Sequence, residues 1–93
     1  MAKVKVQLPG VLRTMTGGQS IIEVECDDVD GALAGLVARH PSLRRYVAPE
    51  GGKLPNYVRV FVGEKDVKTL AGLGTRLADD DIVRVIPAIA GGG

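Results

Sequence analysis

Two runs in which polar and apolar residues alternate constrain the fold of this chain more than any other feature. Lys3–Leu8 and Ser20–Cys26 each place every second residue on an apolar face and the residues between on a polar face. This is the pattern of a strand that is buried on one side. Gly17 and Gly18 stand between the two runs, and glycine adopts the positive φ angles that tight turns require. The pattern therefore predicts a β-hairpin.

One amphipathic helix is expected after this hairpin. Asp28 is the expected N-cap, and Pro41 marks the end of the helix because proline cannot continue it. Gly31 and Gly35 each cost about 1 kcal/mol of helix propensity relative to alanine, so the helix needs packing against a sheet that can approach closely there. The apolar stripe that would face this sheet comprises Val29, Ala32, Leu33, Leu36 and Val37.

The second half of the chain predicts more strands with less regular connections. Residues 41–55 contain prolines and a Gly-Gly pair and are expected to form an irregular connection. The elements expected after it are a strand over Tyr57–Val62, a turn over Gly63–Asp66, a short segment that begins at Val67, turns or one helical turn over 70–77, and a last strand over Ile82–Ile86.

This order of elements predicts an α+β fold in which one main helix packs on one face of a mixed sheet. If the first and last strands pair in the middle of the sheet they run parallel, because the intervening helix supplies the crossover. A length of 93 residues leaves room for one domain. We expect residues 1–87 to form that domain and residues 88–93 to form a flexible glycine tail.

Composition argues against several functional classes. The net charge is +1 and the aromatic residues are two Tyr and one Phe, which disfavours a nucleic-acid interface. Cys26 and His40 are the only cysteine and histidine, so neither an intramolecular disulfide nor a four-coordinate Cys/His zinc site can form. No apolar stretch approaches the ~18 residues of a membrane span. We expect a cytoplasmic protein without a metal site of its own.

The terminal glycines, Gly91 to Gly93, are residues that the packing of a core does not explain. A frayed tail is one interpretation. The functional interpretation is that a segment without Cβ atoms enters a narrow channel in another protein, and residues 88–93 could extend up to ~20 Å at about 3.3 Å per residue. The terminal carboxylate would become an acyl donor there once adenylation by ATP supplied a leaving group that sulfur or an amine could displace.

Several stretches of the chain together resemble the MoaD/ThiS family of ubiquitin-like β-grasp sulfur carriers. The resemblance covers essentially the whole chain and is nearest to the carriers of thiocarboxylate-dependent cysteine biosynthesis. It implies a β-grasp fold and a carrier that is not itself an enzyme. The stretches that carry it are Leu12-Arg13, Thr16–Gln19, Gly52–Leu54, Val60–Val62 leading into Asp66-Val67, the turn over 77–83, Pro87 and the terminal glycines.

The resemblance also implies a reaction cycle whose cofactors belong to partner enzymes. An E1-like enzyme would adenylate the terminal glycine with ATP, and sulfur transfer would leave a thiocarboxylate. In the cysteine branch, a pyridoxal-phosphate-dependent synthase would use this sulfur, and a zinc metallopeptidase would release the cysteine formed on the tail. Family members commonly end in two glycines after an alanine, whereas Gly91, Gly92 and Gly93 follow Ala90 here. The modified residue is therefore expected to be Gly93, or Gly92 if Gly93 is trimmed.

Two related functions remain as alternatives at this point. One is the small subunit of molybdopterin synthase, whose tail inserts into a larger catalytic subunit. The other is a ubiquitin-like modifier that is joined to lysines. Both share the glycine tail, so the sequence separates them poorly from a sulfur carrier.

A docking surface for a partner is expected on the uncovered face of the sheet. Arg59 and Phe61 on one strand, with Arg84 and Ile86 on another, would share this face if the two strands are neighbours. An exposed aromatic flanked by arginines resembles the composition of interfaces, with ordinary surface decoration as the alternative. Cys26 is expected to be a small buried hydrophobe, and the aspartates at 79–81 a solvated turn.

Overall fold

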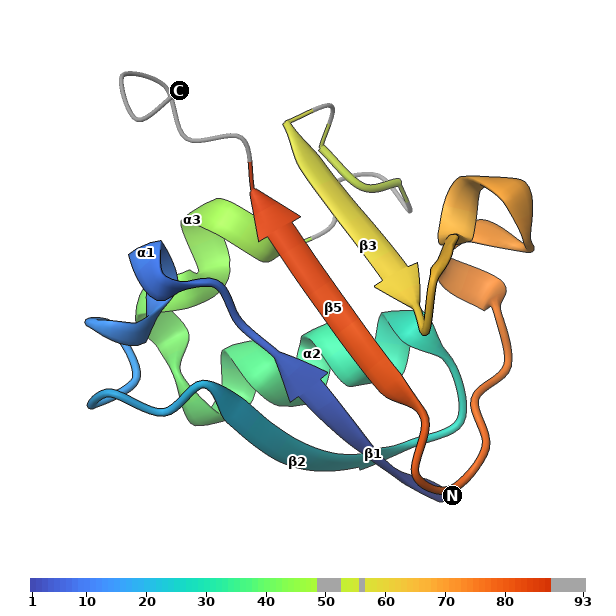
Figure 1. Cartoon of the computed structure of the whole chain (residues 1–93), viewed down its shortest axis with the longest axis horizontal. Helices are drawn as coiled ribbons and strands as arrows, with labels where there is room; N and C mark the ends of the chain where they lie inside the picture. The colour runs from blue at the N-terminus through green and yellow to red at the C-terminus, as the bar shows by residue number, and fades with distance from the viewer. Residues whose placement is uncertain (49–52, 56, 88–93) are drawn as a thin grey trace.

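Five strands form one mixed sheet in the computed structural model, which describes residues 1–48, 53–55 and 57–87. The two central strands run parallel, and every other pair of neighbours is antiparallel (Figure 1). This arrangement confirms the predicted hairpin and the parallel pairing of the first and last strands. The strands, in their order across the sheet, are β2 (Ile21–Cys26), β1 (Ala2–Gln7), β5 (Ile82–Pro87), β3 (Val58–Val62) and β4 (Lys65–Asp66).

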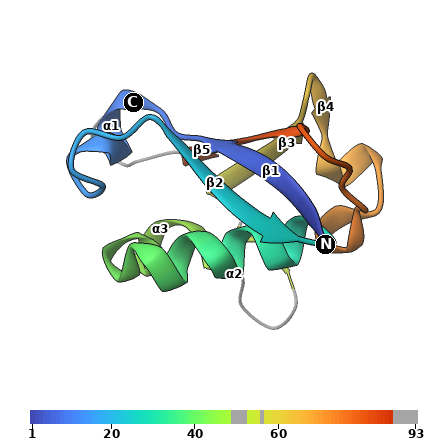
Figure 2. The ribbon, with the colours of Figure 1, turned by 90° about the horizontal axis from the view of Figure 1, so that it is seen from below.

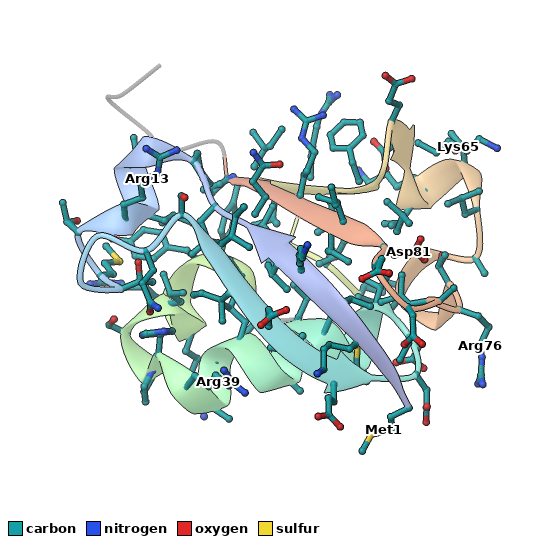
Figure 3. All side chains as sticks on the ribbon, turned by 60° about the horizontal axis from the view of Figure 1, so that its bottom comes forward. Met1, Arg13, Arg39, Lys65, Arg76 and Asp81 are labelled. Atoms are coloured by element: carbon teal, nitrogen blue, oxygen red, sulfur yellow. The ribbon has the colours of Figure 1, made fainter. Side chains whose placement is uncertain are left out.

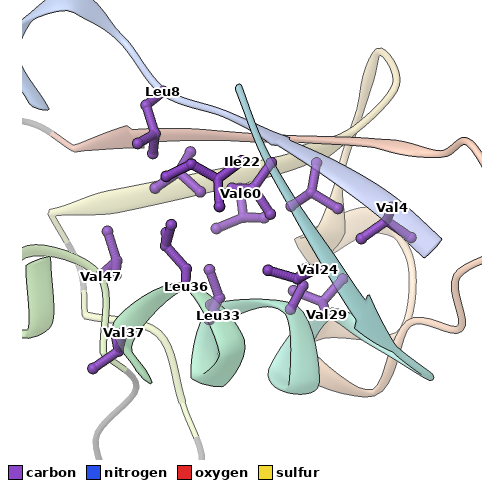
Figure 4. Packing of buried hydrophobic residues seen from close by; sticks show 14 of the residues in the cluster. Val4, Leu8, Ile22, Val24, Val29, Leu33, Leu36, Val37, Val47 and Val60 are labelled. Atoms are coloured by element: carbon purple, nitrogen blue, oxygen red, sulfur yellow. The ribbon is translucent and has the colours of Figure 1, made fainter. Parts of the chain in front are cut away.

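The main helix, α2 (Val29–Arg39), lies across one face of the sheet and leaves the other face open (Figure 2). Its first turn is capped as expected, because the Asp28 carboxylate accepts a hydrogen bond from the Gly31 N–H at 2.9 Å. All five residues of its predicted apolar stripe are buried. Leu33 and Leu36 point into the space beneath Val60 of the sheet (Figure 4). The core is therefore one layer of side chains between α2 and the strands.

The two glycines inside α2 allow the helix to lie close to β2. A Cβ added at Gly31 would stand 3.1 Å from the Cβ of Cys26, and one added at Gly35 would stand 3.3 Å from Cγ1 of Val24. Nine in ten real Cβ contacts are longer than this, so a side chain at either position would push its neighbour away by a few tenths of an ångström. The helix propensity lost at both glycines is offset by this close packing, as the sequence predicts.

Two short helices occupy segments that we expected to be irregular, and this is a correction. Gly10–Arg13 forms α1, and within the predicted irregular connection Pro41–Leu43 forms a 3-10 turn that leads into α3 (Arg44–Val47). Each segment buries apolar side chains completely, namely Leu12, Leu43 and Val47. These side chains extend the core beyond the end of α2, which explains why the chain is regular there.

The connection from β3 to β5 also differs in detail from the sequence prediction. The predicted turn at Gly63–Asp66 contains the two-residue strand β4, and the segment beginning at Val67 is a 3-10 turn over Val67–Thr69. A second 3-10 turn covers Gly72–Gly74, within the stretch where turns were expected. The predicted Gly-Gly turn is confirmed, since Gly17 and Gly18 have φ angles of 68° and 90°.

Replacing Gly35 with leucine should destabilise the fold by about 1–2 kcal/mol, because the added atoms overpack the contact with Val24 by more than the gain in helix propensity. Ala34→Leu is the matched control, since Ala34 is exposed on the same helix. Urea denaturation of both variants measures the difference. Equal stability of the two variants would contradict the close approach of α2 to β2.

Candidate functional site

The last strand places the end of the described chain in the middle of the sheet. β5 lies between β1 and β3, and its final residue, Pro87, is buried and pairs with Val58. The predicted tail residues Ala90, Gly91, Gly92 and Gly93 lie outside the described residues. The structure therefore supplies the anchor from which that segment departs, and a central strand paired on both sides is the firmest anchor that a sheet offers.

The four predicted docking residues lie together on the open face. Arg59 stands opposite Ile86 and Phe61 opposite Arg84 in the antiparallel register of β3 and β5. The Arg84 guanidinium carbon lies 6.0 Å from the centroid of the Phe61 ring, within reach of a cation–π interaction. Ile86 is 40% exposed. We call Arg59, Phe61, Arg84 and Ile86 the open-face patch.

Phe61 differs in one respect from the prediction. We expected an exposed aromatic, whereas its side chain is half-buried in the structure. Phe61 pairs with Asp66 on one side and Arg84 on the other, and the Arg84 guanidinium lies over the ring. The patch therefore presents an arginine-covered aromatic with Ile86 as its more open apolar member.

A shallow hollow next to this patch includes a residue that the sequence did not single out. The hollow has a volume of about 230 Å³ and lies where β1 ends beside β5. Arg13 from α1 and Arg84 and Ile86 from β5 contribute to its lining. Arg13 was missed as a site residue because α1 was not predicted. The available signal was the Leu12-Arg13 stretch, which carried the family resemblance but was not assigned to a site.

Cys26 is buried beneath the sheet, as expected. Burial raises the pKa of its thiol, and the nearby carboxylates of Asp28 and Asp27 raise it further. A thiol held protonated and 3% exposed is poorly suited to relay sulfur. His40, at the end of α2, donates its backbone N–H to the carbonyl of Leu36 and caps the helix. Neither residue lies in the open-face patch.

The aspartates that precede β5 have structural roles. Asp79 accepts a hydrogen bond from the Lys3 N–H at 2.9 Å, and Asp81 accepts one from the Ala78 N–H at 2.8 Å. These bonds fix the turn and join it to β1, which confirms the turn prediction. Within the described residues, no cluster of three or more His, Cys, Asp or Glu side chains could hold a metal ion. No helix in this part of the chain is long and apolar enough to cross a membrane.

Comparison with known proteins decides the family. The ThiS family model matches residues 6–92. The sulfur carrier protein CysO of Mycobacterium tuberculosis is 36% identical over 91 residues, which are 96% of this chain and 98% of that protein. The chain belongs to the ThiS family. This confirms the resemblance that the turn before β5 and the terminal glycines carried.

Solved structures place this ThiS-family chain in the ubiquitin-like β-grasp fold. CysO in the Amycolatopsis orientalis BexX/CysO complex matches with a TM-score of 0.83 and 32% identity, over 95% of this chain and 98% of that one. The small archaeal modifier protein 1 of Methanosarcina acetivorans matches with a TM-score of 0.82 and 26% identity, over 98% of this chain and 97% of that one. The predicted fold class is thereby confirmed. CysO is a carrier protein and not an enzyme, and this ThiS-family chain is of the same kind.

The raised pKa of Cys26 predicts how stability depends on pH. Because the unfolded chain forms the thiolate more readily, unfolding releases a proton once the pH exceeds the ordinary thiol pKa of about 8.5. The free energy of unfolding should then fall more steeply between about pH 8 and pH 10 in the native protein than in Cys26→Ala. Urea denaturation at several pH values measures both slopes. Equal slopes of the free energy of unfolding against pH for the native protein and Cys26→Ala would contradict burial of a protonated thiol.

Proposed function

We propose that this protein is a sulfur carrier whose terminal glycine is converted to a thiocarboxylate that donates sulfur, most directly for cysteine biosynthesis. The observation that carries the proposal is the near full-length similarity to CysO, a sulfur carrier, in a chain that also ends in glycines. The fold supports it by anchoring β5, the strand that leads into the terminal residues, between two other strands.

The chemistry needs a carboxyl group and a partner that activates it. The carboxylate attacks the α-phosphate of ATP, which forms an acyl adenylate and releases pyrophosphate. A hydrosulfide nucleophile supplied by the partner then attacks the carbonyl carbon and displaces AMP. The C–S bond forms as the C–O bond to the phosphate breaks, and loss of the remaining proton leaves the thiocarboxylate. This chain contributes the acyl group and the reach of its tail, and its partners contribute ATP binding and the sulfur.

The finer steps of the cysteine branch also belong to partners. A pyridoxal-phosphate-dependent synthase would accept the sulfur onto an activated serine, and a zinc metallopeptidase would release the cysteine from the tail. A solved complex of CysO with BexX supports the general idea that such a carrier binds a separate protein. We assign ATP, pyridoxal phosphate and zinc to these partners.

Gly93 is the residue that we propose to carry the thiocarboxylate, with Gly92 as the alternative if the last residue is removed. The two cases differ by one residue of reach, about 3.3 Å, which is significant inside a fitted channel. If Gly93 carries the thiocarboxylate, Ala90, Gly91 and Gly92 would lie inside the channel of the partner.

The proposal is tested by incubating the protein with the adenylating enzyme of its host, ATP and a sulfur source. Mass spectrometry of the C-terminal peptide should show the exchange of one oxygen for one sulfur, located at Gly93 or at Gly92. A variant without Gly92 and Gly93 is the control and should remain unmodified. An unchanged peptide in the full-length protein, with an enzyme shown to be active, would contradict the proposal.

A protein modifier joined to lysines is the second candidate, because the small archaeal modifier protein 1 shares the fold at 26% identity. The same adenylate would then be attacked by an amine, which forms an isopeptide bond. Intact-mass analysis of protein isolated from the host distinguishes the two, since a modifier appears as adducts on lysines and a carrier as the free thiocarboxylate.

We assign the open-face patch to the docking of the adenylating partner. Phe61→Asp should raise the KM for the carrier about tenfold with kcat nearly unchanged, because a carboxylate replaces the apolar centre of the surface. Ile82→Asp is the control, since Ile82 is 44% exposed on β5 but lies toward its other end. Thermal unfolding verifies that both variants fold. Equal KM values for Phe61→Asp and the native protein would remove the assignment.

A further inference from the structure

The charges of this small domain are segregated along its strands. At the end where β5 finishes, exposed arginines come from four elements: Arg13 from α1, Arg44 and Arg45 from α3, Arg59 from β3 and Arg84 from β5. We call these five residues the arginine collar. Figure 3 shows Arg13 at this end of the sheet, with Asp81, Lys65 and Arg76 toward the other end.

Specific contacts bring the collar together around the anchor of the tail. Arg13 and Arg84 line the same hollow beside the end of β5. The Tyr57 hydroxyl donates a hydrogen bond to the Arg45 carbonyl at 3.2 Å, which joins α3 to the start of β3. β3 begins opposite Pro87, because Val58 pairs with that residue. Arg13, Arg59 and Arg84 therefore lie beside the end of β5. α3 brings Arg44 and Arg45 to the same end of the domain, where Arg44 lines a hollow against α2.

The acidic residues gather at the opposite end of the strands. Three loops meet there: the turn from β2 into α2, the turn after β3, and the turn before β5. The amino group of Met1 also lies at this end, 3.7 Å from the Asp27 carboxylate. The carboxylates in these loops are Asp27, Asp28, Asp30, Glu64, Asp66, Asp79, Asp80 and Asp81.

The collar arginines are not neutralised within the part of the chain that the structure describes. The one ion pair recorded there joins Met1 to Asp27, at the other end. Two collar members lie instead over aromatic rings, Arg45 at 5.7 Å from the centroid of Tyr46 and Arg84 at 6.0 Å from that of Phe61. Such stacking orients a guanidinium and leaves its N–H groups free to donate to a carboxylate.

We propose that the arginine collar is a docking surface for a protein partner whose tail-accepting channel has an acidic rim. The inference rests on the proposed function, since the collar lies at the end of the domain where β5 leads into the segment that a partner must admit. Arginine donates bidentate hydrogen bonds to carboxylates, so Asp and Glu side chains around the channel would fix the position of the domain while the tail enters. The acidic rim would repel the acidic end of the domain, and this repulsion would orient the domain with its tail toward the partner.

A protein fits this collar better than a nucleic acid does. The net charge of the chain is only +1, and the acidic loops would repel a polyanion that extended along the domain. Tyr46, Tyr57 and Phe61 are the only aromatics, and Phe61 is half-buried against Arg84, which leaves few platforms on which bases could stack. An acidic rim is compact enough to meet the collar without reaching the acidic end.

The test compares two variants with the same change in net charge. The collar variant carries Arg13→Glu, Arg44→Glu and Arg45→Glu, and the control carries Lys65→Glu, Lys68→Glu and Arg76→Glu at the opposite end. All six side chains are exposed, and thermal unfolding verifies both folds. The Kd for the adenylating enzyme of the host is measured without ATP by fluorescence anisotropy, and ATP–pyrophosphate exchange is followed on the same samples.

The collar variant should bind at least about tenfold more weakly than the native protein in about 50 mM NaCl, and this gap should narrow in about 500 mM NaCl because salt screens exposed charges. The control should bind within about threefold of the native protein. Equal losses of affinity in the two variants, or a loss of affinity that salt does not reduce, would overturn the assignment of the collar as a docking surface. A second result would also overturn the collar as a protein-docking surface. In it, the native protein and the control bind an RNA oligonucleotide tightly, the collar variant does not, and all three bind the enzyme equally well.

The two readouts separate this inference from the proposed function. Collar-dependent binding without pyrophosphate exchange by the native protein would support the collar and contradict the carrier chemistry. Exchange by the native protein with collar-independent binding would support the chemistry and overturn the collar. The absence of both binding and exchange would overturn both.

Discussion

The parallel pairing of β1 with β5 is the constraint on which the rest of this structure depends. Val6 pairs with Val83 and Gln7 with Arg84, so the first and last strands of the domain lie side by side at the centre of the sheet. Parallel neighbours require a crossover, and α2 supplies it by covering one face. Both strands consequently end at the same edge of the sheet, which α1 and α3 adjoin. The strand that leads into the terminal glycines is therefore held on both sides, and the open-face patch lies at its end.

Regular patterns in the sequence predicted the layered core well. Alternation identified four of the strands to within one residue at each end; β1, for example, spans Ala2–Gln7 where Lys3–Leu8 was predicted. The i, i+3, i+4 stripe identified the buried face of α2, and its glycines indicated a close approach that the contacts with Val24 and Cys26 confirm. These features succeed because they repeat over five or more residues, so that burial on one side leaves a readable period.

Short elements could not be predicted in the same way. α1 and α3 have four residues each, which is too few for a helical period, and the prolines and glycines in and around them point to loops. What stabilises them is the burial of Leu12, Leu43 and Val47 in a core that exists only after the sheet has formed. The position of Arg13 depends on α1 and was therefore missed. The open-face patch was predicted because it depends only on strand alternation and on β3 lying beside β5. The terminal glycines were recognised from their chemistry and their family, not from structure.

The central claim is that the terminal carboxyl group is the reacting group, and one measurement tests it most directly. The protein is prepared by semisynthesis in two forms that differ only at the C-terminus, one ending in the free acid and the other in the primary amide. ATP–pyrophosphate exchange by the adenylating enzyme of the host is then measured with each. The account predicts exchange with the acid and none with the amide, although both bind the enzyme, because an amide cannot attack the α-phosphate as a carboxylate does. Equal exchange with both forms would contradict it.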